Sequence, residues 1–295
     1  MAKNKIKSNR LVFAVVSVVA LGLYSLSLIL PLLWAINSSL KNSLDLFENV
    51  LGLPTGGPLF ENYLKAFEKI EAPINLASGG SRKVSLLEMF YNSLFYAGVG
   101  SFVVEFSRCA VAYCCAKYKK YRVMRILHSI VVVLLVVSLP VSLASQIRLF
   151  RNIGVYNNMY GLVAISGTFT GVHFLYFYAV FSSLSWEYAE AGFMDGASHF
   201  KVFFKIMLPQ ISATFLALYL LSFIEVWNDY SASLTLMPNY PTVAYGLFKY
   251  NSLNAASSVP LQLAGCVLVA LPILILFFIF KDKLIGNLNI GGLKG

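Results

Sequence analysis

The stretch EAGFMDGASHFKVFFKIMLP at residues 190–209 decides how the chain is interpreted. It is a charged segment that lies between two long apolar segments. Ser185 is a suitable N-cap for a short helix over residues 185–193, and Glu187 in the first turn is favoured by the helix dipole. Gly196 suits the left-handed position that ends such a helix.

A second helix is predicted over His199–Leu208. One face carries apolar side chains and another carries Lys201 and Lys205; the apolar set is Phe200, Phe203, Phe204 and Met207. Pro209 interrupts this helix or opens the next one, because proline is tolerated at a helix start. The stretch therefore predicts a polar helix–turn–helix inside an apolar chain.

The composition places the chain in a membrane. It is 58% hydrophobic and 12% charged, whereas soluble domains are about 25% charged. The net charge of +10 does not indicate a nucleic-acid partner, because the basic residues sit beside apolar spans, as in cytoplasmic membrane loops. We expect no nucleic acid and a surface in contact with membrane lipid.

A membrane-crossing helix needs roughly twenty apolar residues. On that criterion the chain has about six candidate spans: Leu11–Ile36, Phe90–Ala116, Ile126–Ile147, Tyr160–Leu184, Ile211–Leu236 and Leu261–Phe280. The first is too long for the apolar part of a signal peptide and no small-residue cleavage site follows it, so it is expected to be retained.

Lysines and arginines gather in four regions that fall on one side of a six-span protein: before the first span, between spans two and three, in residues 185–209, and after the last span. The residues are Lys3, Lys5, Lys7, Arg10, Lys117, Lys119, Lys120, Arg122, Arg125, Lys201, Lys205, Lys281 and Lys283. Basic residues favour the cytoplasm, which predicts cytoplasmic N and C termini. Exceptions on the outer side are Arg82, Lys83, Arg148, Arg151 and Lys249.

We treat residues 1–295 as a single transmembrane domain. An outer loop covers about residues 41–88, with turns at 54–58 and 78–81 and a short surface helix over Phe60–Ile70. A cytoplasmic tail covers about residues 281–295.

The Glu190-Ala191 pair, Gly196 and the Ile206-Met207-Leu208-Pro209 ending resemble the EAA loop of permease subunits of ABC importers. Gly192 stands where that family usually has a second alanine. Asp195-Gly196-Ala197 is typical of its carbohydrate-importing members. Further similar stretches are Leu30 to Trp34, Ser39-Leu40-Lys41, Glu61-Asn62-Tyr63, Tyr91 to Leu94 and Gly286 to Gly295. The chain is most similar to the second permease subunit of maltose-type importers.

The resemblance implies an all-α permease fold with a cytoplasmic coupling helix, in a bacterial or archaeal inner membrane. The ATPase-coupling residues would be Glu190, Ala191, Gly192, Asp195, Gly196 and Ala197. Expected partners are a second homologous permease, two copies of a cytoplasmic ATPase and an extracytoplasmic sugar-binding protein. No cofactor is expected in this chain, and ATP and magnesium are expected in the partner subunits. The alternative for the loop is an amphipathic linker that only covers the membrane surface.

Several ionisable residues fall inside the expected spans. Glu105 and Arg108 share one helix face, where they either form a functional pair toward a cavity or neutralise each other for insertion. His173 is either a proton relay or a packed helix-contact residue. Gly167 and Gly171 have a spacing that permits close helix contact.

Aromatic and polar residues in the fifth expected span resemble a sugar-binding set. They are Tyr219, Phe223, Trp227, Asn228 and Asp229, and we predict a possible substrate path beside them. Tryptophan and tyrosine also anchor helices at membrane interfaces, and that alternative stays open.

No catalytic cluster and no metal-ligand spacing is found, and the four cysteines lie in or beside apolar runs. The phosphate-loop pattern of ATPases is also absent from the sequence. The chain is therefore expected not to be an enzyme, and a membrane-embedded enzyme has no support. The alternative is a self-contained ion-coupled transporter or channel that uses Glu105, Asp229 or His173.

Overall fold

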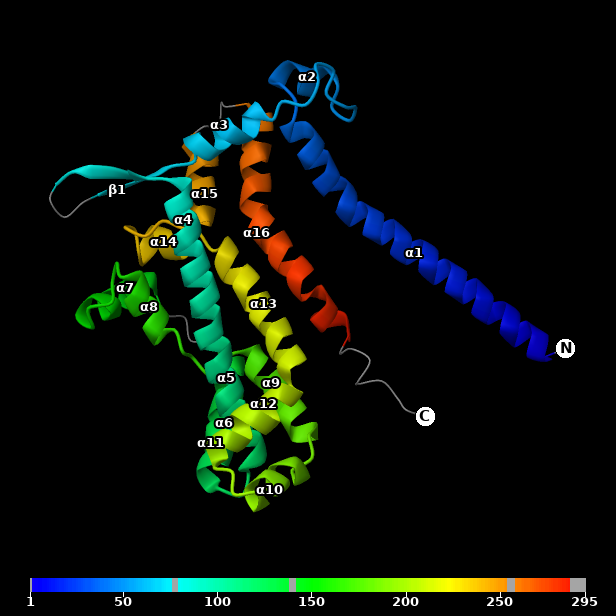
Figure 1. Ribbon diagram of the computed structural model, residues 1–295, viewed down its shortest axis with the longest axis vertical. Helices are drawn as coiled ribbons and strands as arrows, with labels where there is room; N and C mark the ends of the chain where they lie inside the picture. The colour runs from blue at the N-terminus through cyan, green and yellow to red at the C-terminus, as the bar shows by residue number, and fades with distance from the viewer. Residues whose placement is uncertain (1, 76–78, 138–141, 254–257, 287–295) are drawn as a thin grey trace. The chain divides into compact units, whose positions relative to one another are not determined.

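The computed structural model describes residues 2–75, 79–137, 142–253 and 258–286 (Figure 1). These residues are mostly helical, and two short strands are the only strands among them. The chain divides into two compact units: Met1–Ile70 with Tyr250–Leu271, and Glu71–Lys249 with Pro272–Gly295. The tail that was expected from residue 281 lies outside the described residues from residue 287 onward.

The first unit begins with α1 (Ala2–Ser39), followed by α2 (Ser43–Glu48) and α3 (Glu61–Lys69). Helix α3 confirms the helix predicted over Phe60–Ile70. The side chains of α1 from Phe13 to Leu32 are largely exposed and apolar, as expected for a helix whose surroundings are hydrocarbon or another subunit.

Two of the stretches singled out in the sequence meet in this unit. The Asn62 Nδ2 amide donates to the backbone carbonyls of Ser39 and Lys41, each at 2.8 Å. The Ser39 and Tyr63 hydroxyls are 2.6 Å apart. The Lys41 Nζ atom, fully buried, donates to the Asn49 carbonyl at 2.5 Å. The bond from Asn62 satisfies the Ser39 carbonyl at the C-terminal end of α1, where carbonyl groups lack partners within the helix.

The second unit opens with an antiparallel hairpin of β1 (Ala72–Asn75) and β2 (Ser81–Val84), paired Ala72 with Val84. The turn predicted at residues 78–81 lies partly outside the described residues, and Ser81 begins β2. The strands were not predicted, because neither run alternates clearly between apolar and polar residues. Helix α4 (Leu86–Ser93), the π-helix η1 (Leu94–Val99) and α5 (Gly100–Lys117) then form one long helix.

Two of the predicted spans are wrong as continuous helices. Over Ile126–Ile147 the structure has α6 (Arg122–Val136) and α7 (Leu143–Asn152). Over Tyr160–Leu184 it has α8 (Met159–Ile165) and α9 (Val172–Ser183). Gly171 precedes α9 with φ +124°, a conformation that side-chain-bearing residues rarely adopt and that cannot continue a helix.

In the described part of the chain, three helical stretches are long and apolar enough to cross a membrane: Phe13–Ser39, Leu86–Lys117 and Val259–Asp282. A fourth results if the bent pair His199–Gln210 and Ser212–Asn228 counts as one span. The fifth span, predicted over Ile211–Leu236, is shorter in the structure. Helix α13 (Ser212–Asn228) ends at Asn228, and a separate helix, α14 (Ser231–Thr235), follows it. The last helices are α15 (Val243–Leu253) and α16 (Val259–Gly286).

The core of the second unit is built around α5, which packs along both α9 and α13. Its buried members include Cys109, Tyr113, Phe177 and Phe181, all at most 4% exposed. The Tyr113 and Phe181 rings meet edge to face, with centroids 5.3 Å apart. Buried aromatic rings supply much of the contact area between these helices.

The segment between α9 and α13 folds onto this core. It contains α10 (Glu187–Met194), α11 (His199–Val202), the π-helix η2 (Phe203–Met207) and α12 (Leu208–Gln210). Helix α10 contacts α11 and η2 at Gly192, where a Cβ atom would lie 2.5 Å from Ile206 Cδ1 and 3.3 Å from Val202 Cγ2. This close contact leaves little room for a larger side chain at residue 192.

Replacing Gly192 with valine is expected to lower the unfolding free energy by about 1–3 kcal/mol, because the added methyl groups overpack the contact with Ile206 and Val202. The neighbouring Ala191→Val change, on the exposed side of α10, should stay within about 0.5 kcal/mol. Thermal unfolding of the detergent-purified proteins measures both. Equal shifts in the two variants would contradict the packing described at Gly192.

Candidate functional site

The candidate site is the segment of residues 185–209, here called the EAA segment. Helix α10 begins after Trp186, and the Ser185 hydroxyl accepts a hydrogen bond from the Glu187 amide at 3.2 Å. The predicted N-cap role of Ser185 is wrong, because Trp186 is the N-cap and the helix starts at Glu187, two residues later than predicted.

A Schellman-type turn ends α10. Gly196 has φ +75°, its amide donates to Phe193 O at 3.0 Å, and the Ala197 amide donates to Gly192 O at 2.9 Å. Gly196 therefore takes the left-handed position predicted from the sequence. Ser198 then caps α11, and its hydroxyl accepts from the Lys201 amide at 3.4 Å.

Helix α10 has two distinct faces. Ala189 and Gly192 are buried against the core. Glu190, Ala191 and Asp195 are exposed, as is Gly196, whereas Ala197 is half-buried. Five of the six predicted coupling residues are therefore at least partly accessible, and Gly192 packs inward.

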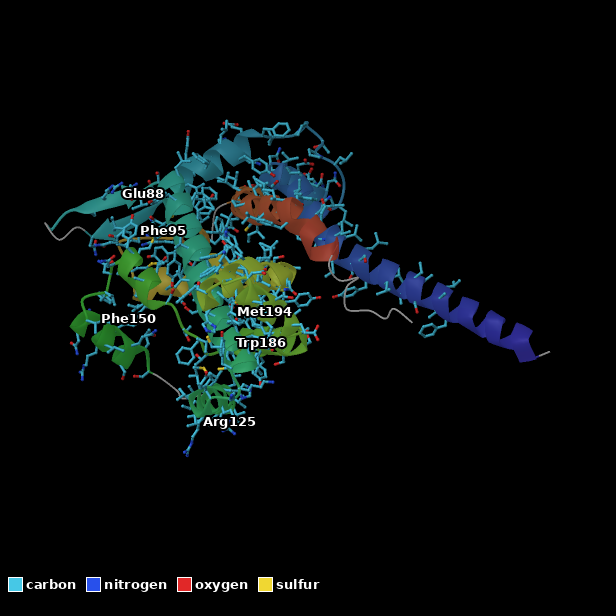
Figure 2. All side chains as sticks on the ribbon, turned by 60° about the horizontal axis from the view of Figure 1, so that its bottom comes forward. Glu88, Phe95, Arg125, Phe150, Trp186 and Met194 are labelled. Carbon is cyan, nitrogen blue, oxygen red and sulfur yellow. The ribbon has the colours of Figure 1, made fainter. Side chains whose placement is uncertain are left out.

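The sequence missed two further members of the exposed face. Met194 is 83% exposed and Tyr188 is 54% exposed. Trp186 and Met194, which bracket α10, are labelled in Figure 2. Large apolar side chains so exposed at the end of a short helix indicate a surface suited to another protein. Their helical spacing from Glu190 and Ala191 was the signal available in the sequence.

Aromatic side chains fix the EAA segment to the end of α5. The Tyr118 ring meets Trp186 at 5.8 Å and His199 at 5.7 Å between centroids, and His199 meets Phe193 at 4.7 Å. The Tyr118 hydroxyl also lies 2.7 Å from His199 Nδ1. Burial raises the pKa of Tyr118, so this hydroxyl keeps its proton near neutral pH.

Two more contacts hold the segment in place. The Lys117 Nζ atom donates to the Leu184 carbonyl at 2.5 Å, at the C-terminal end of α9. Phe203 of η2 is buried against Tyr113, with centroids 4.9 Å apart. The predicted apolar face of the second helix is thus divided: Phe203 and Met207 are buried, whereas Phe200 and Phe204 are exposed.

An apolar groove of about 420 Å³ lies beside the EAA segment. Its walls come from α5, the loop after it, and the α11–η2 helix; the lining includes Phe106, Tyr113, Tyr121, Phe200 and Phe204. After this helix the chain bends by 79° between Gln210 and Ser212. Pro209 lies in α12, near the end of the helical stretch His199–Gln210. It therefore neither interrupts the second predicted helix nor opens the next span, and the break comes at Ile211.

The predicted sugar-path residues are only partly accessible. Phe223 and Trp227 are at most 2% exposed and stack on each other with centroids 5.5 Å apart. The Tyr219 hydroxyl donates to Gly98 O at 3.2 Å. Asn228 is exposed and donates to Ile224 O, and Asp229 accepts from the Ser231 amide at 2.8 Å. These residues do not form one exposed aromatic platform within this chain, and their contact with sugar stays a prediction.

The ionisable residues predicted inside the spans come together, with Arg108 and His173 each within hydrogen-bonding distance of Glu105. Arg108 Nη1 lies 2.6 Å from Glu105 Oε1, and His173 Nδ1 lies 2.9 Å from the same oxygen. The partner of His173 that the sequence did not identify is therefore Glu105. Ser222 also contacts this oxygen, at 2.7 Å, and was missed because a lone serine in an apolar run carries no distinctive pattern.

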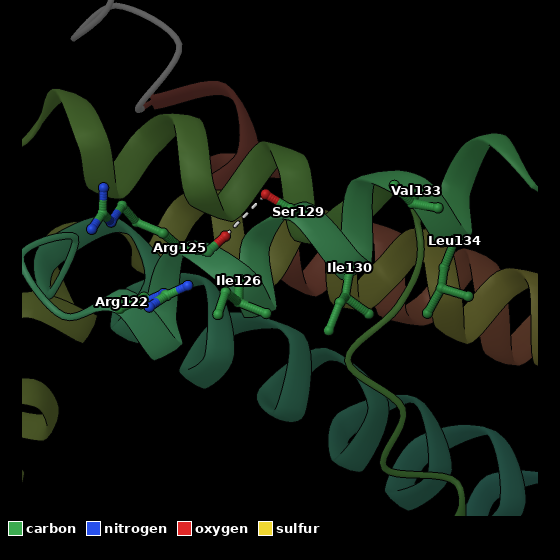
Figure 3. Close-up of a pocket in the computed structure, with 7 residues that line it drawn as sticks. All are labelled: Arg122, Arg125, Ile126, Ser129, Ile130, Val133 and Leu134. Atoms are coloured by element: carbon green, nitrogen blue, oxygen red, sulfur yellow. Dashed lines mark hydrogen bonds between the residues drawn. The ribbon is translucent and has the colours of Figure 1, made fainter.

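An open hollow of about 520 Å³ follows one side of α6 (Figure 3). Arg122 and Arg125 lie at one end, and Ile126, Ile130 and Val133 continue from them. Such an arrangement is typical of a helix end at a membrane–water boundary. Within the described ranges, no group of three or more His, Cys, Asp or Glu side chains is arranged to hold a metal ion.

Known proteins resemble this chain along most of its length. The probable ABC transporter permease protein YurM of Bacillus subtilis is 26% identical over 94% of this chain and 87% of its own. The diacetylchitobiose uptake system permease protein NgcG of Streptomyces coelicolor is 25% identical over 95% of this chain and 88% of its own.

A solved structure has the same fold. It belongs to a bacterial ABC transporter involved in the import of the acidic polysaccharide alginate, and it matches with a TM-score of 0.72 and 20% identity, over 92% of this chain and 96% of that one. The family model described as binding-protein-dependent transport system inner membrane component matches residues 110–286, which contain the whole EAA segment. With α10 held between α9 and α13 in that matched region, the chain belongs to the family of inner membrane components of binding-protein-dependent transport systems.

Proposed function

We propose that this chain is one of two permease subunits of a carbohydrate ABC importer, and that α10 is its coupling helix. The observation that carries the coupling role is the exposed face of α10, where Glu190 and Ala191 are accessible while Ala189 and Gly192 fix the opposite face to the core. Relatives named for oligosaccharide uptake, among them the arabinooligosaccharides permease AraQ and the diacetylchitobiose permease NgcG, support a di- or oligosaccharide as cargo.

The exposed face has the chemistry of a docking surface. Small residues let another backbone approach closely, Met194 offers an adaptable apolar contact, and Glu190 suits a basic group on the partner. The partner is a cytoplasmic ATPase, present in two copies, that binds ATP and Mg²⁺. This chain contributes no phosphate-binding loop, so hydrolysis takes place in the ATPase.

Movement would pass from the ATPase through α10 to the helices on either side. The aromatic contacts of Trp186 and His199 with Tyr118, and of Phe193 with His199, make the EAA segment move together with the end of α5. A rigid segment of this kind transmits a displacement, whereas a flexible linker would absorb it.

The proposal of a carbohydrate ABC importer also implies further subunits and a membrane topology. A second, homologous permease completes the pathway, and an extracytoplasmic binding protein delivers the sugar. We infer six membrane crossings, some of them by broken helices, with both termini and the EAA segment on the cytoplasmic side of a bacterial or archaeal inner membrane. Within this chain, Tyr219, Asn228 and Asp229 are the accessible part of the proposed sugar path.

Reversing the charge of Glu190 tests the coupling role. Glu190→Lys should leave membrane insertion intact but weaken ATPase binding and abolish transport, because repulsion in a contact that becomes buried costs up to about several kcal/mol. Gly196→Leu should act similarly by straining the left-handed turn. Co-purification of the ATPase and sugar uptake measure the effect.

Glu68→Lys is the matched control, since Glu68 is an exposed carboxylate on α3, on the proposed outer side. It should bind the ATPase and transport sugar like the unmodified protein. Normal ATPase binding and uptake in both EAA-segment variants would refute the coupling role of α10.

Cysteine labelling tests the topology. In a background without the four native cysteines, Ser81→Cys and Lys201→Cys place single thiols at exposed positions of β2 and α11. Because the Lys and Arg distribution puts them on opposite sides, an impermeant reagent applied outside intact cells should label only residue 81. Labelling of both positions would rule out the six-span arrangement.

Reconstitution tests the energy source. In liposomes the purified chain alone should neither hydrolyse ATP nor move sugar, because it supplies only part of a pathway and one coupling helix. Adding the second permease and the ATPase should give hydrolysis that sugar-loaded binding protein stimulates. Sugar accumulation by this chain alone under a proton or sodium gradient would instead establish the ion-coupled alternative.

A further inference from the structure

The two helices that flank the EAA segment are joined through a third helix. Helix α9 precedes the EAA segment in the chain and α13 follows it, and both pack along α5. Contacts between α9 and α13 themselves are few by comparison with those that each makes to α5. A displacement of the EAA segment therefore reaches α9 and α13 as one motion only if α5 holds them together.

One carboxylate oxygen on α5 makes that connection. Glu105 Oε1 accepts hydrogen bonds from Arg108 Nη1 of α5 at 2.6 Å, Ser222 Oγ of α13 at 2.7 Å and His173 Nδ1 of α9 at 2.9 Å. A carboxylate oxygen can only accept, so His173 donates from Nδ1 in this contact. One atom thus bonds to all three helices.

Arg108 extends the connection to the start of α9. Its Nε atom donates to Thr170 O at 2.9 Å. Gly171 leaves room for the guanidinium group, because a Cβ atom at that position would lie 2.9 Å from Arg108 Nη2. Gly171 therefore has two functions in the fold: its positive φ marks the start of α9, and its lack of a side chain leaves space for Arg108.

Burial makes these bonds sensitive to loss of a partner. Glu105 is fully buried, Ser222 is 5% exposed, and the Arg108 and His173 side chains are 18% and 20% exposed. Charge-assisted hydrogen bonds are strong away from water, and a buried charge left unpaired is costly. Rearranging α9 against α13 would break such bonds, so the helices keep one relative position.

We propose that Glu105 is a positioning residue for transport: it fastens α9 and α13 to α5, so that movement of the EAA segment shifts both helices together. The inference rests on the proposed coupling function of that segment. It assigns to Glu105, His173 and Ser222 the transmission of the movement, and to Glu190 the binding of the ATPase. Loss of Glu105 should therefore separate ATP hydrolysis from transport without releasing the ATPase.

The variants are Glu105→Ala, Ser222→Ala, His173→Ala and His173→Asn in the assembled transporter. Asparagine places an amide N–H near the position of His173 Nδ1, so it should retain the bond that alanine removes. Ser101→Ala is the matched control: Ser101 lies one helical turn before Glu105, is 1% exposed, and its hydroxyl has no hydrogen-bond partner among the described residues.

Three quantities are measured for each variant: ATPase co-purification, thermal stability, and sugar molecules transported per ATP hydrolysed in proteoliposomes. We expect normal co-purification throughout. The ratio should fall on the order of tenfold in Glu105→Ala, fall less in Ser222→Ala and His173→Ala, and recover in His173→Asn. Ser101→Ala should keep the ratio of the unmodified transporter.

An unchanged ratio in Ser222→Ala and His173→Ala, whatever their stability, would overturn the proposal, as would equal losses in His173→Asn and His173→Ala. Loss of ATPase co-purification in Glu105→Ala would also overturn it. Failure of the coupling function itself has a different signature, because Glu190→Lys would then bind the ATPase and transport sugar normally.

Discussion

Every backbone N–H and C=O group in a membrane interior needs a partner within the protein, because each unsatisfied group costs about several kcal/mol there. This constraint explains why a chain that is 58% hydrophobic is built mostly of helices in its described part. It also explains the contacts at the places where the helices are interrupted. Where helices end inside the apolar segments, side chains supply the missing partners: Arg108 bonds to Thr170 O before α9, and Lys117 bonds to Leu184 O after it.

The same logic shapes the EAA segment. In its proposed coupling role, α10 would present small and acidic side chains to another protein while keeping a fixed orientation. The structure achieves both by giving the two faces of α10 different roles, with Gly192 packed under Ile206 and Glu190 left in the open. The Schellman-type turn at Gly196 and the aromatic rings around Tyr118 hold that orientation.

Local patterns in the sequence predicted local structure well. Gly196 was identified as a left-handed residue and α3 as a surface helix, because capping and helical periodicity depend on near neighbours. Continuous helices over Ile126–Ile147 and Tyr160–Leu184 were wrong, because hydrophobicity alone does not reveal where a helix breaks. The three-helix contact at Glu105 was beyond prediction, since His173 and Ser222 lie 68 and 117 residues away along the chain.

The π-helix η2 (Phe203–Met207) affects how the EAA segment would respond to a change in its length. A π-helical turn amounts to one extra residue in an α-helix, and each residue of an α-helix advances the direction of the side chains by about 100°. Removing one residue from Phe203–Met207 would let this stretch close into a regular α-helix, so the bend at Ile211 and the axis of α13 would keep their direction. A single deletion in η2 would therefore be absorbed locally, whereas a deletion within α10 would turn the side chains after it by about 100° and misdirect its exposed face.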